Sequence, residues 1–143
     1  MYAPRSILPA SRRSTPSPSR ARSGDSDQPL RRISSLRVEA RAGEGSYPER
    51  IVRYRDLSAD GLKEKVGFTA REMESRLAAF GFGWKETTAA QAYTVHDFHP
   101  MMADELVRRG AARSGLTWHF ARPPVVDLEF EMDCRRVSRE LVI

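Results

Sequence analysis

Cysteine is nearly absent from this chain of 143 residues: Cys134 is the only one. A single thiol excludes a disulfide framework, and we therefore expect a reducing compartment. Long hydrophobic runs are absent as well. Because no stretch of about 18 apolar residues occurs, the sequence predicts no membrane-spanning helix and no membrane partner.

Acidic residues are absent before Asp25, and this absence divides the chain into two parts. Residues 1–37 carry eight arginines and two aspartates, a net charge of +6, whereas residues 38–143 carry 16 basic and 17 acidic side chains, a net charge of −1. The overall charge of +5 therefore belongs to the N-terminal arm. The rest of the chain lacks the basic surface that phosphate backbones require, so we expect no nucleic-acid partner.

The arm, residues 1–45, is rich in Ser, Arg, Pro and Ala. This composition predicts disorder, because little apolar surface is available to offset the entropy of ordering. Arg- and Ser-rich, acid-poor N-termini are also typical of transit peptides, and "RVEARA" at residues 37–42 fits a processing site. Two hypotheses stay open: a transit peptide for a plastid or mitochondrion, or a basic tail on a cytoplasmic protein. Residues 46–143 form the predicted folded domain.

Two segments have the features of helices. In residues 68–81, Thr69 and Glu72 have the spacing of a capping box, and Gly81 supplies a left-handed C-cap. The apolar side chains that share one face of this segment are Met73, Leu77 and Phe80. Residues 100–110 form the second helix, with proline in the first turn, acidic residues before basic ones, and glycine at the end.

Short strands are predicted at residues 50–57, 92–95, 116–120 and 126–134. In the last, apolar side chains alternate with Asp127, Glu129, Glu131 and Asp133, so that the two sets lie on opposite faces. The apolar face requires a core. The acidic face is either a functional site or a solvated strand whose charges discourage aggregation. The order strand, helix, strand, helix, strand, strand predicts an α+β fold with helices on one face of a sheet.

Two specific functions are disfavoured by spacing. His96, Asp97 and His99, with His119 further on, match no common zinc motif, so we expect hydrogen-bonded histidines and no metal. Residues 67–83 resemble the first helix and turn of a helix-turn-helix. No basic recognition helix follows Gly83, so a winged-helix DNA binder is the least favoured function.

The segment from about Thr69 to Val137 resembles the RidA/YjgF family of imine deaminases, which includes 2-aminomuconate deaminase. The resemblance is carried by "RLAAFGFGW", "AYTVHDF" and "LTWHFARPPVVDLEFEMD". It implies a chorismate-mutase-like fold, a mixed sheet with two helices on one face, a homotrimer, and ligand pockets between subunits. The family's two N-terminal strands and its Ser-Gly-Gln segment have no match in residues 46–67, so the resemblance covers the C-terminal half of the family only.

The same resemblance implies hydrolysis of a small imine or enamine of an amino or keto acid, without a cofactor. Glu129 falls where the family keeps the glutamate that positions the attacking water, a role suited to a carboxylate. Arg113 is nearest to the family arginine that binds the substrate carboxylate. Arg122 matches a neighbouring arginine, and Tyr93 lies in the tyrosine-containing strand, so both are candidate substrate-binding residues. A non-catalytic oligomeric binding or scaffold module of the same fold is the alternative.

Overall fold

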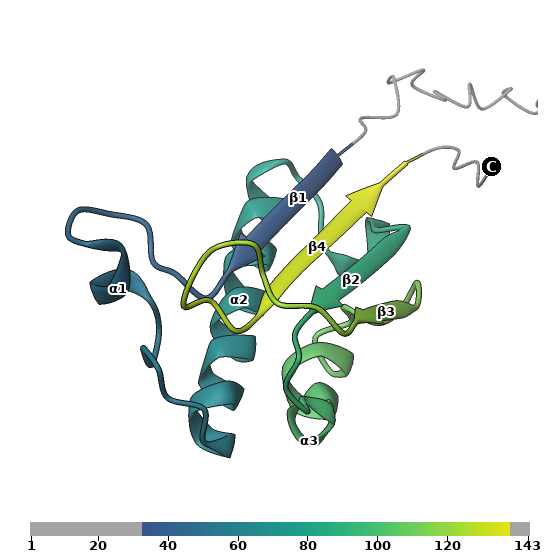
Figure 1. Ribbon diagram of the computed structural model, residues 1–143. Helices are drawn as coiled ribbons and strands as arrows, with labels where there is room; N and C mark the ends of the chain where they lie inside the picture. Colours follow the sequence, from purple (N-terminus) through teal and green to yellow (C-terminus); the bar gives the residue numbers. More distant parts are fainter. Residues whose placement is uncertain (1–32, 138–143) are drawn as a thin grey trace, which may run out of the picture.

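The computed structural model describes residues 33–137, in which a four-stranded mixed sheet is backed by helices (Figure 1). The strands, in the spatial order β1-β4-β2-β3, are β1 (Ile33–Val38), β4 (Glu131–Arg136), β2 (Ala89–Tyr93) and β3 (Leu116–His119). Strand β4 is antiparallel to both β1 and β2, and β2 is parallel to β3. The helical elements are α1 (Tyr47–Arg50), α2 (Ala59–Ala79), the 3-10 turn η1 (Trp84–Glu86), α3 (His99–Met102) and the π-helical turn η2 (Ala103–Val107).

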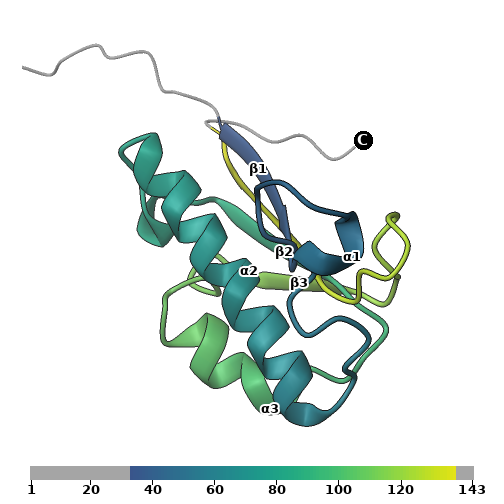
Figure 2. The same ribbon diagram turned by 90° about the vertical axis from the view of Figure 1, so that its left-hand side faces the viewer.

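Helices α2 and α3 cover one face of the sheet (Figures 1 and 2). Strand residues alternate between the two faces, so every second side chain of β2 and β4 points to the helices. These side chains are Ala90, Ala92, Met132 and Cys134, all fully buried. They pack against Leu62, Val66, Ala70, Met73 and Leu77 of α2 and against Met101 and Leu106. The prediction of an α+β fold, with a mixed sheet and two helices on one face, is confirmed.

The first strand lies in a different place from the one predicted. Strand β1 occupies Ile33–Val38, inside the segment 1–45 that composition assigned to disorder, and pairs along its length with β4. Residues 33–45 are therefore part of the fold, whereas residues 1–32 lie outside the described residues. Composition failed here because the pairing partner of β1 lies at the other end of the chain, where no local pattern reports it.

The strand predicted at 50–57 is wrong. Helix α1 ends at Arg50, Ile51 forms an isolated bridge with Ala40, and the following turn holds Arg53 and Arg55 at φ 51° and 56°. The sequence nevertheless contains a local signal for the start of helix α1. The backbone N–H of Ser46 donates to the Glu49 carboxylate at 2.8 Å, which is half of a capping box, and proline stands in the first turn.

Helix α2 begins nine residues before the predicted start. Its N-cap is Ser58, whose hydroxyl accepts the Gly61 N–H at 3.1 Å. Thr69, predicted to cap the helix, is instead fully buried in its middle, and its hydroxyl donates to the Lys65 carbonyl at 2.9 Å. The two glycines of this first half made it resemble a loop. The predicted end is confirmed: Gly81 has φ 79° and follows the last turn.

The last strand is shorter than the acidic alternation predicted. Strand β4 starts at Glu131, and Asp127 sits in a turn with φ 66°. The four carboxylates therefore do not form one row, because only Glu131 and Asp133 belong to the strand. The strand predicted at 116–120 agrees with β3, and the second predicted helix agrees with α3 and η2. Strand β2 begins three residues before the predicted strand 92–95 and ends two residues before its predicted end. Within residues 33–137, no helix combines the length and apolar character needed to cross a bilayer.

Candidate active site

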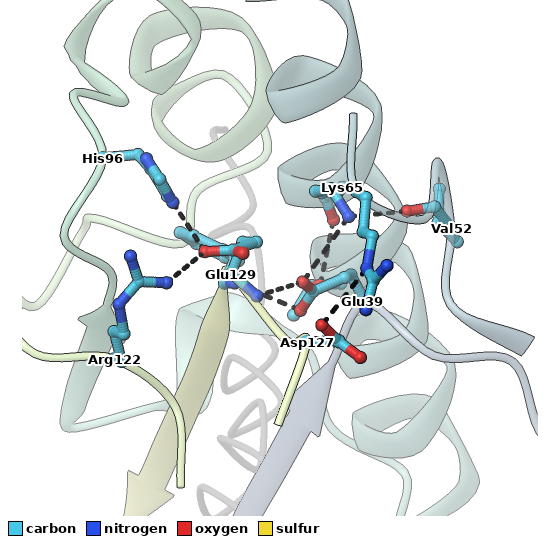
Figure 3. Close-up of polar contacts among 10 residues, drawn as sticks. Glu39, Val52, Lys65, His96, Arg122, Asp127 and Glu129 are labelled. Carbon is cyan, nitrogen blue, oxygen red and sulfur yellow. Dashed lines mark hydrogen bonds and ion pairs between the residues drawn. The ribbon is translucent and has the colours of Figure 1, made fainter. Parts of the chain in front are cut away.

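Glu129 lies two residues before the start of β4, where two connections of the chain converge (Figure 3). His96 comes from the connection between β2 and α3, and Arg122 comes from the connection between β3 and β4. The parallel pairing of β2 with β3 brings both connections to the same end of the sheet, and antiparallel β4 starts there. The topology therefore gathers an acid, an imidazole and a guanidinium at one sheet end.

The carboxylate of Glu129 is held through a single oxygen. His96 Nε2 lies 2.6 Å and Arg122 Nη1 lies 2.9 Å from the same Glu129 Oε2 (Figure 3). The Glu129 side chain is 13% exposed and that of His96 is 18% exposed, whereas Arg122 is largely open to solvent. Among residues 33–137, no group hydrogen-bonds to Glu129 Oε1. This second oxygen is the one that a substrate or a water molecule could approach.

The backbone under Glu129 is fixed by a second carboxylate, that of Glu39. Its oxygens accept the backbone N–H groups of Glu129 and of Phe130, the latter at 3.1 Å. Glu39 is fully buried, and so is Lys65, whose Nζ lies 3.8 Å from Glu39 Oε1. Burial raises the pKa of Glu39, while its hydrogen bonds and the ammonium of Lys65 oppose that rise.

A hollow of about 380 Å³ opens beside Glu129. One continuous segment lines it, residues 122–129, with the two prolines 123 and 124 in its wall. Asp127 anchors the far side of this segment: it accepts the Tyr54 hydroxyl at 3.0 Å and lies 3.5 Å from Arg55. Apolar side chains and the charged groups of Arg122, Asp127 and Glu129 thus line the hollow together.

The structure brings together only two of the four predicted site residues, Glu129 and Arg122. Arg113 is exposed and precedes β3, at the opposite end of that strand from Arg122. Tyr93 lies on the sheet face that the helices leave open, where its hydroxyl donates to Asp133 at 2.9 Å. Burial and the neighbouring carboxylates raise the pKa of Tyr93 to about 12, so it stays protonated.

Tyr93 belongs to a polar network on the open sheet face. Its ring stacks on His119 with centroids 4.7 Å apart, and Gln91 bridges His119 and Asp133.

His99 pairs with Asp97 on the exposed surface. No group of three or more potential metal ligands occurs within residues 33–137. His96, His99 and His119 each have a side-chain hydrogen-bonding partner, namely Glu129, Asp97 and Gln91.

Three members of the site escaped sequence reasoning. His96 was considered only as a metal ligand, and nothing local connects it with Glu129. Glu39 falls in the segment that resembled a processing site, and Lys65 falls in a stretch that resembled a polar loop. Their partners lie far away along the chain, so no spacing rule could have paired them.

The helix-turn-helix hypothesis is wrong, because the 3-10 turn η1 and then β2 follow α2.

Residues 22–141 match the family described as 2-aminomuconate deaminase CnbZ. The chain belongs to this family. It is 47% identical over 105 residues to a 2-amino-5-chloromuconate deaminase from Comamonas testosteroni. That match covers 73% of this chain but 42% of the relative, so the chain spans less than half of the relative's length.

Solved structures share the fold of this member of the 2-aminomuconate deaminase family. A Rid-family protein of unknown function from Yersinia pestis has a TM-score of 0.54 and 15% identity, over 74% of this chain and 77% of that one. A Thermotoga maritima protein with an endoribonuclease assignment has a TM-score of 0.51 and 17% identity, with the same coverage of both chains. The resemblance to the RidA/YjgF family is thus confirmed, and the fold is of the Rid type.

Proposed function

We propose that this chain is a deaminase domain that hydrolyses the C=N bond of an imine formed from an aminomuconate-type enamine. The observation that carries the proposal is the Glu129 carboxylate, held by His96 and Arg122 through Oε2 while Oε1 keeps no partner among residues 33–137. Membership of the 2-aminomuconate deaminase family supports the substrate class. So does the relative at 47% identity, which is named for deamination of 2-amino-5-chloromuconate.

The reaction needs little from the protein except a positioned water. An enamine first tautomerises to its imine, and protonation of the imine nitrogen makes the C=N carbon electrophilic. Water adds to that carbon while losing a proton to Glu129, which forms a tetrahedral amino alcohol. Proton transfer to nitrogen then breaks the C–N bond, releases ammonia and leaves a ketone. A carboxylate within hydrogen-bond reach of the water is suited to both proton transfers.

The partners of Glu129 set the direction of its free oxygen. His96 donates from Nε2 when the imidazole carries its proton there, and Arg122 donates from Nη1. Both donors engage Oε2, so the carboxylate cannot rotate without losing two charge-assisted or short hydrogen bonds. Oε1 is therefore held in one position, as attack on a bound imine carbon requires.

Arginine residues supply the recognition of the substrate carboxylates. Arg122 uses one nitrogen on Glu129 and makes no other ion pair among residues 33–137, so its remaining N–H donors are available for a carboxylate. Arg113 lies at the other end of β3 within one subunit. We propose that it joins Glu129 across a subunit boundary in a homotrimer, as the family resemblance implies.

A non-catalytic binding module of the same fold is the second candidate. The observation that favours it is the position of Arg113, which lies away from Glu129 within the single subunit. Such a module would bind a dicarboxylate without turning it over. Turnover measurements separate the two functions.

The proposal is tested by ammonia release from 2-aminomuconate and 2-amino-5-chloromuconate, with 2-iminopropionate generated in place as a simpler substrate. We expect Glu129→Gln to lower kcat about 100-fold or more, the range typical of a lost general base. We expect Arg122→Ala and Arg113→Ala to raise KM for substrates that carry a carboxylate.

Glu44→Gln is the matched control, because Glu44 is an exposed acid whose side chain makes no hydrogen bond or ion pair among residues 33–137. It should turn over substrate like the wild type. Equal activity in the wild type and in Glu129→Gln would contradict the catalytic role. Saturable binding of the dicarboxylate without any release of ammonia would favour the binding module instead.

A further inference from the structure

Glu39 and Lys65 form an ion pair that is closed off from solvent, since both side chains have an exposed fraction of 0%. Glu39 follows β1, and Lys65 lies in the first half of α2. Besides its 3.8 Å approach to Glu39, Lys65 Nζ donates to the Val52 carbonyl at 2.8 Å. With the backbone of Glu129 and Phe130, which Glu39 also binds, four separate segments of the chain meet at this pair, which lies beside Glu129 in Figure 3.

Stability alone gives no reason for such a pair. Taking two charges out of water costs several kcal/mol per ion, and apolar side chains of similar volume often stabilise a fold equally well. The buried acid Glu131, the first residue of β4, carries the same charge as Glu39, and the repulsion between the two carboxylates adds to the cost. The buried carboxylate of Glu39 is therefore explained by the groups that it binds and not by its contribution to stability.

Glu39 binds the two consecutive backbone N–H groups of Glu129 and Phe130. Two fixed N–H groups in a row define the orientation of the peptide unit between these residues, and hence the direction in which the Glu129 side chain leaves the backbone. Only a carboxylate has an acceptor for each of them. A glutamine would place an NH₂ group against one N–H.

We infer that Glu39 is a positioning residue that fixes the backbone of Glu129 for the reaction, with Lys65 holding the Glu39 carboxylate in place. The inference rests on the proposed function of Glu129, and Glu39 touches no reacting atom. A misplacement of Glu129 by about 1 Å is enough to lower turnover by up to about 100-fold.

Two variants of Glu39 separate its charge from its reach. Glu39→Gln keeps the length and removes the charge, whereas Glu39→Asp keeps the charge and shortens the side chain by one methylene. We expect each to lower kcat by about 10- to 100-fold with KM changed less than threefold, and Glu44→Gln to match the wild type. Because Glu39 acts through Glu129, we expect Glu39→Gln to cost little further activity when Glu129→Gln is already present.

Nuclear magnetic resonance supplies a readout that needs no turnover. In the wild type, the amides of Glu129 and Phe130 donate to Glu39 and to no backbone carbonyl of residues 33–137, so their slow hydrogen exchange would report this contact. We expect both amide resonances to shift in Glu39→Gln and Glu39→Asp. The imidazole resonances of His96 should shift with them, because its Nε2 contacts Glu129. Glu44→Gln should change none of these signals.

The two readouts distinguish the inference from the proposed function. An inactive wild type whose amide and His96 signals respond to Glu39 would contradict the proposed function and leave the positioning contact standing. Rapid exchange of the Glu129 and Phe130 amides in the wild type would overturn the inference even if both variants fail to fold. Full kcat in a folded Glu39→Gln variant of an active enzyme would overturn it as well.

Discussion

At the scale of single residues, carboxylates that are neighbours in the sequence have very different surroundings. Asp127 is held by Tyr54 and Arg55 in a turn, and Glu129 is held by one imidazole and one guanidinium. Glu131 is 6% exposed and accepts no side-chain hydrogen bond within residues 33–137. Alternation along a strand cannot distinguish these acids, because their partners come from other segments.

Glu131 should respond to pH in a predictable direction. Burial raises its pKa above the ordinary value of 4.5, and the charges of Asp133 and Glu39 raise it further. Its contribution to stability is thus full below about pH 4.5 and falls as pH rises through the pKa of the folded state. Glutamine resembles the protonated acid, so we expect Glu131→Gln to stabilise the protein at pH 7.5 by about 1 kcal/mol.

That gain should vanish near pH 4, because the side chain at position 131 is then largely uncharged in the wild type as well as in the variant. Urea unfolding at the two pH values measures it, with Glu44→Gln as a control that shows no such pH dependence. Destabilisation of Glu131→Gln at pH 7.5, or a gain that is equal at both pH values, would contradict the assignment.

At the scale of elements, β1 has a role that its composition did not indicate. The strand closes the β4 side of the sheet, and the residue after its end, Glu39, reaches under Glu129. A processing cut at residue 42, as "RVEARA" would place it, removes both. We therefore propose that any targeting segment ends before Ile33, the first residue of β1.

Two truncations test this boundary. A chain that starts at Ile33 should keep a cooperative thermal transition, because it retains the complete sheet. A chain that starts at Gly43 leaves Lys65 buried without its counter-ion, at a cost of about 3–5 kcal/mol, and exposes the edge of β4. We expect it to be unfolded by circular dichroism, and a stable, cooperatively melting chain from Gly43 would contradict the boundary.

At the scale of the whole molecule, the two faces of the sheet differ. Helices α2 and α3 cover one face (Figure 2). The other face carries Tyr93, His119 and Leu36, of which Leu36 is 50% exposed. Phe120, at the end of β3, is 76% exposed. A domain of about 100 residues has a marginal core, and association through the open face would bury additional apolar surface.

We accordingly predict a homotrimer in solution, measured by light scattering at micromolar concentration. Leu36→Asp places a charge on the open face and should weaken the trimer. Val107→Asp is the matched control, because Val107 is equally exposed but belongs to η2 on the helical side. A monomeric wild type, or equal dissociation in both variants, would contradict association through this face.

Several features of the protein were determined by sequence alone, and all of them are local. The end of α2 at Gly81, the strand at 116–120 and the second helix each depend on contacts within a few residues, so propensity and capping rules predict them. Glu129 and Arg122 were candidates because of the resemblance to the RidA/YjgF family, and the structure places their side chains in contact. These two positions are separated by only seven residues.

Tertiary structure decided the rest, because the remaining contacts join segments that are distant along the chain. Strand β1 exists because β4 pairs with it, and Lys65 is buried because Glu39 and Val52 meet it inside the fold. His96 became a partner of Glu129 because parallel β2 and β3 end side by side. Arg113 precedes β3, so it lies at the end of that strand opposite to His96 and Glu129. A chain's local pattern carries no record of such pairings, since the free energy that selects them comes from burial and hydrogen bonding in the completed fold.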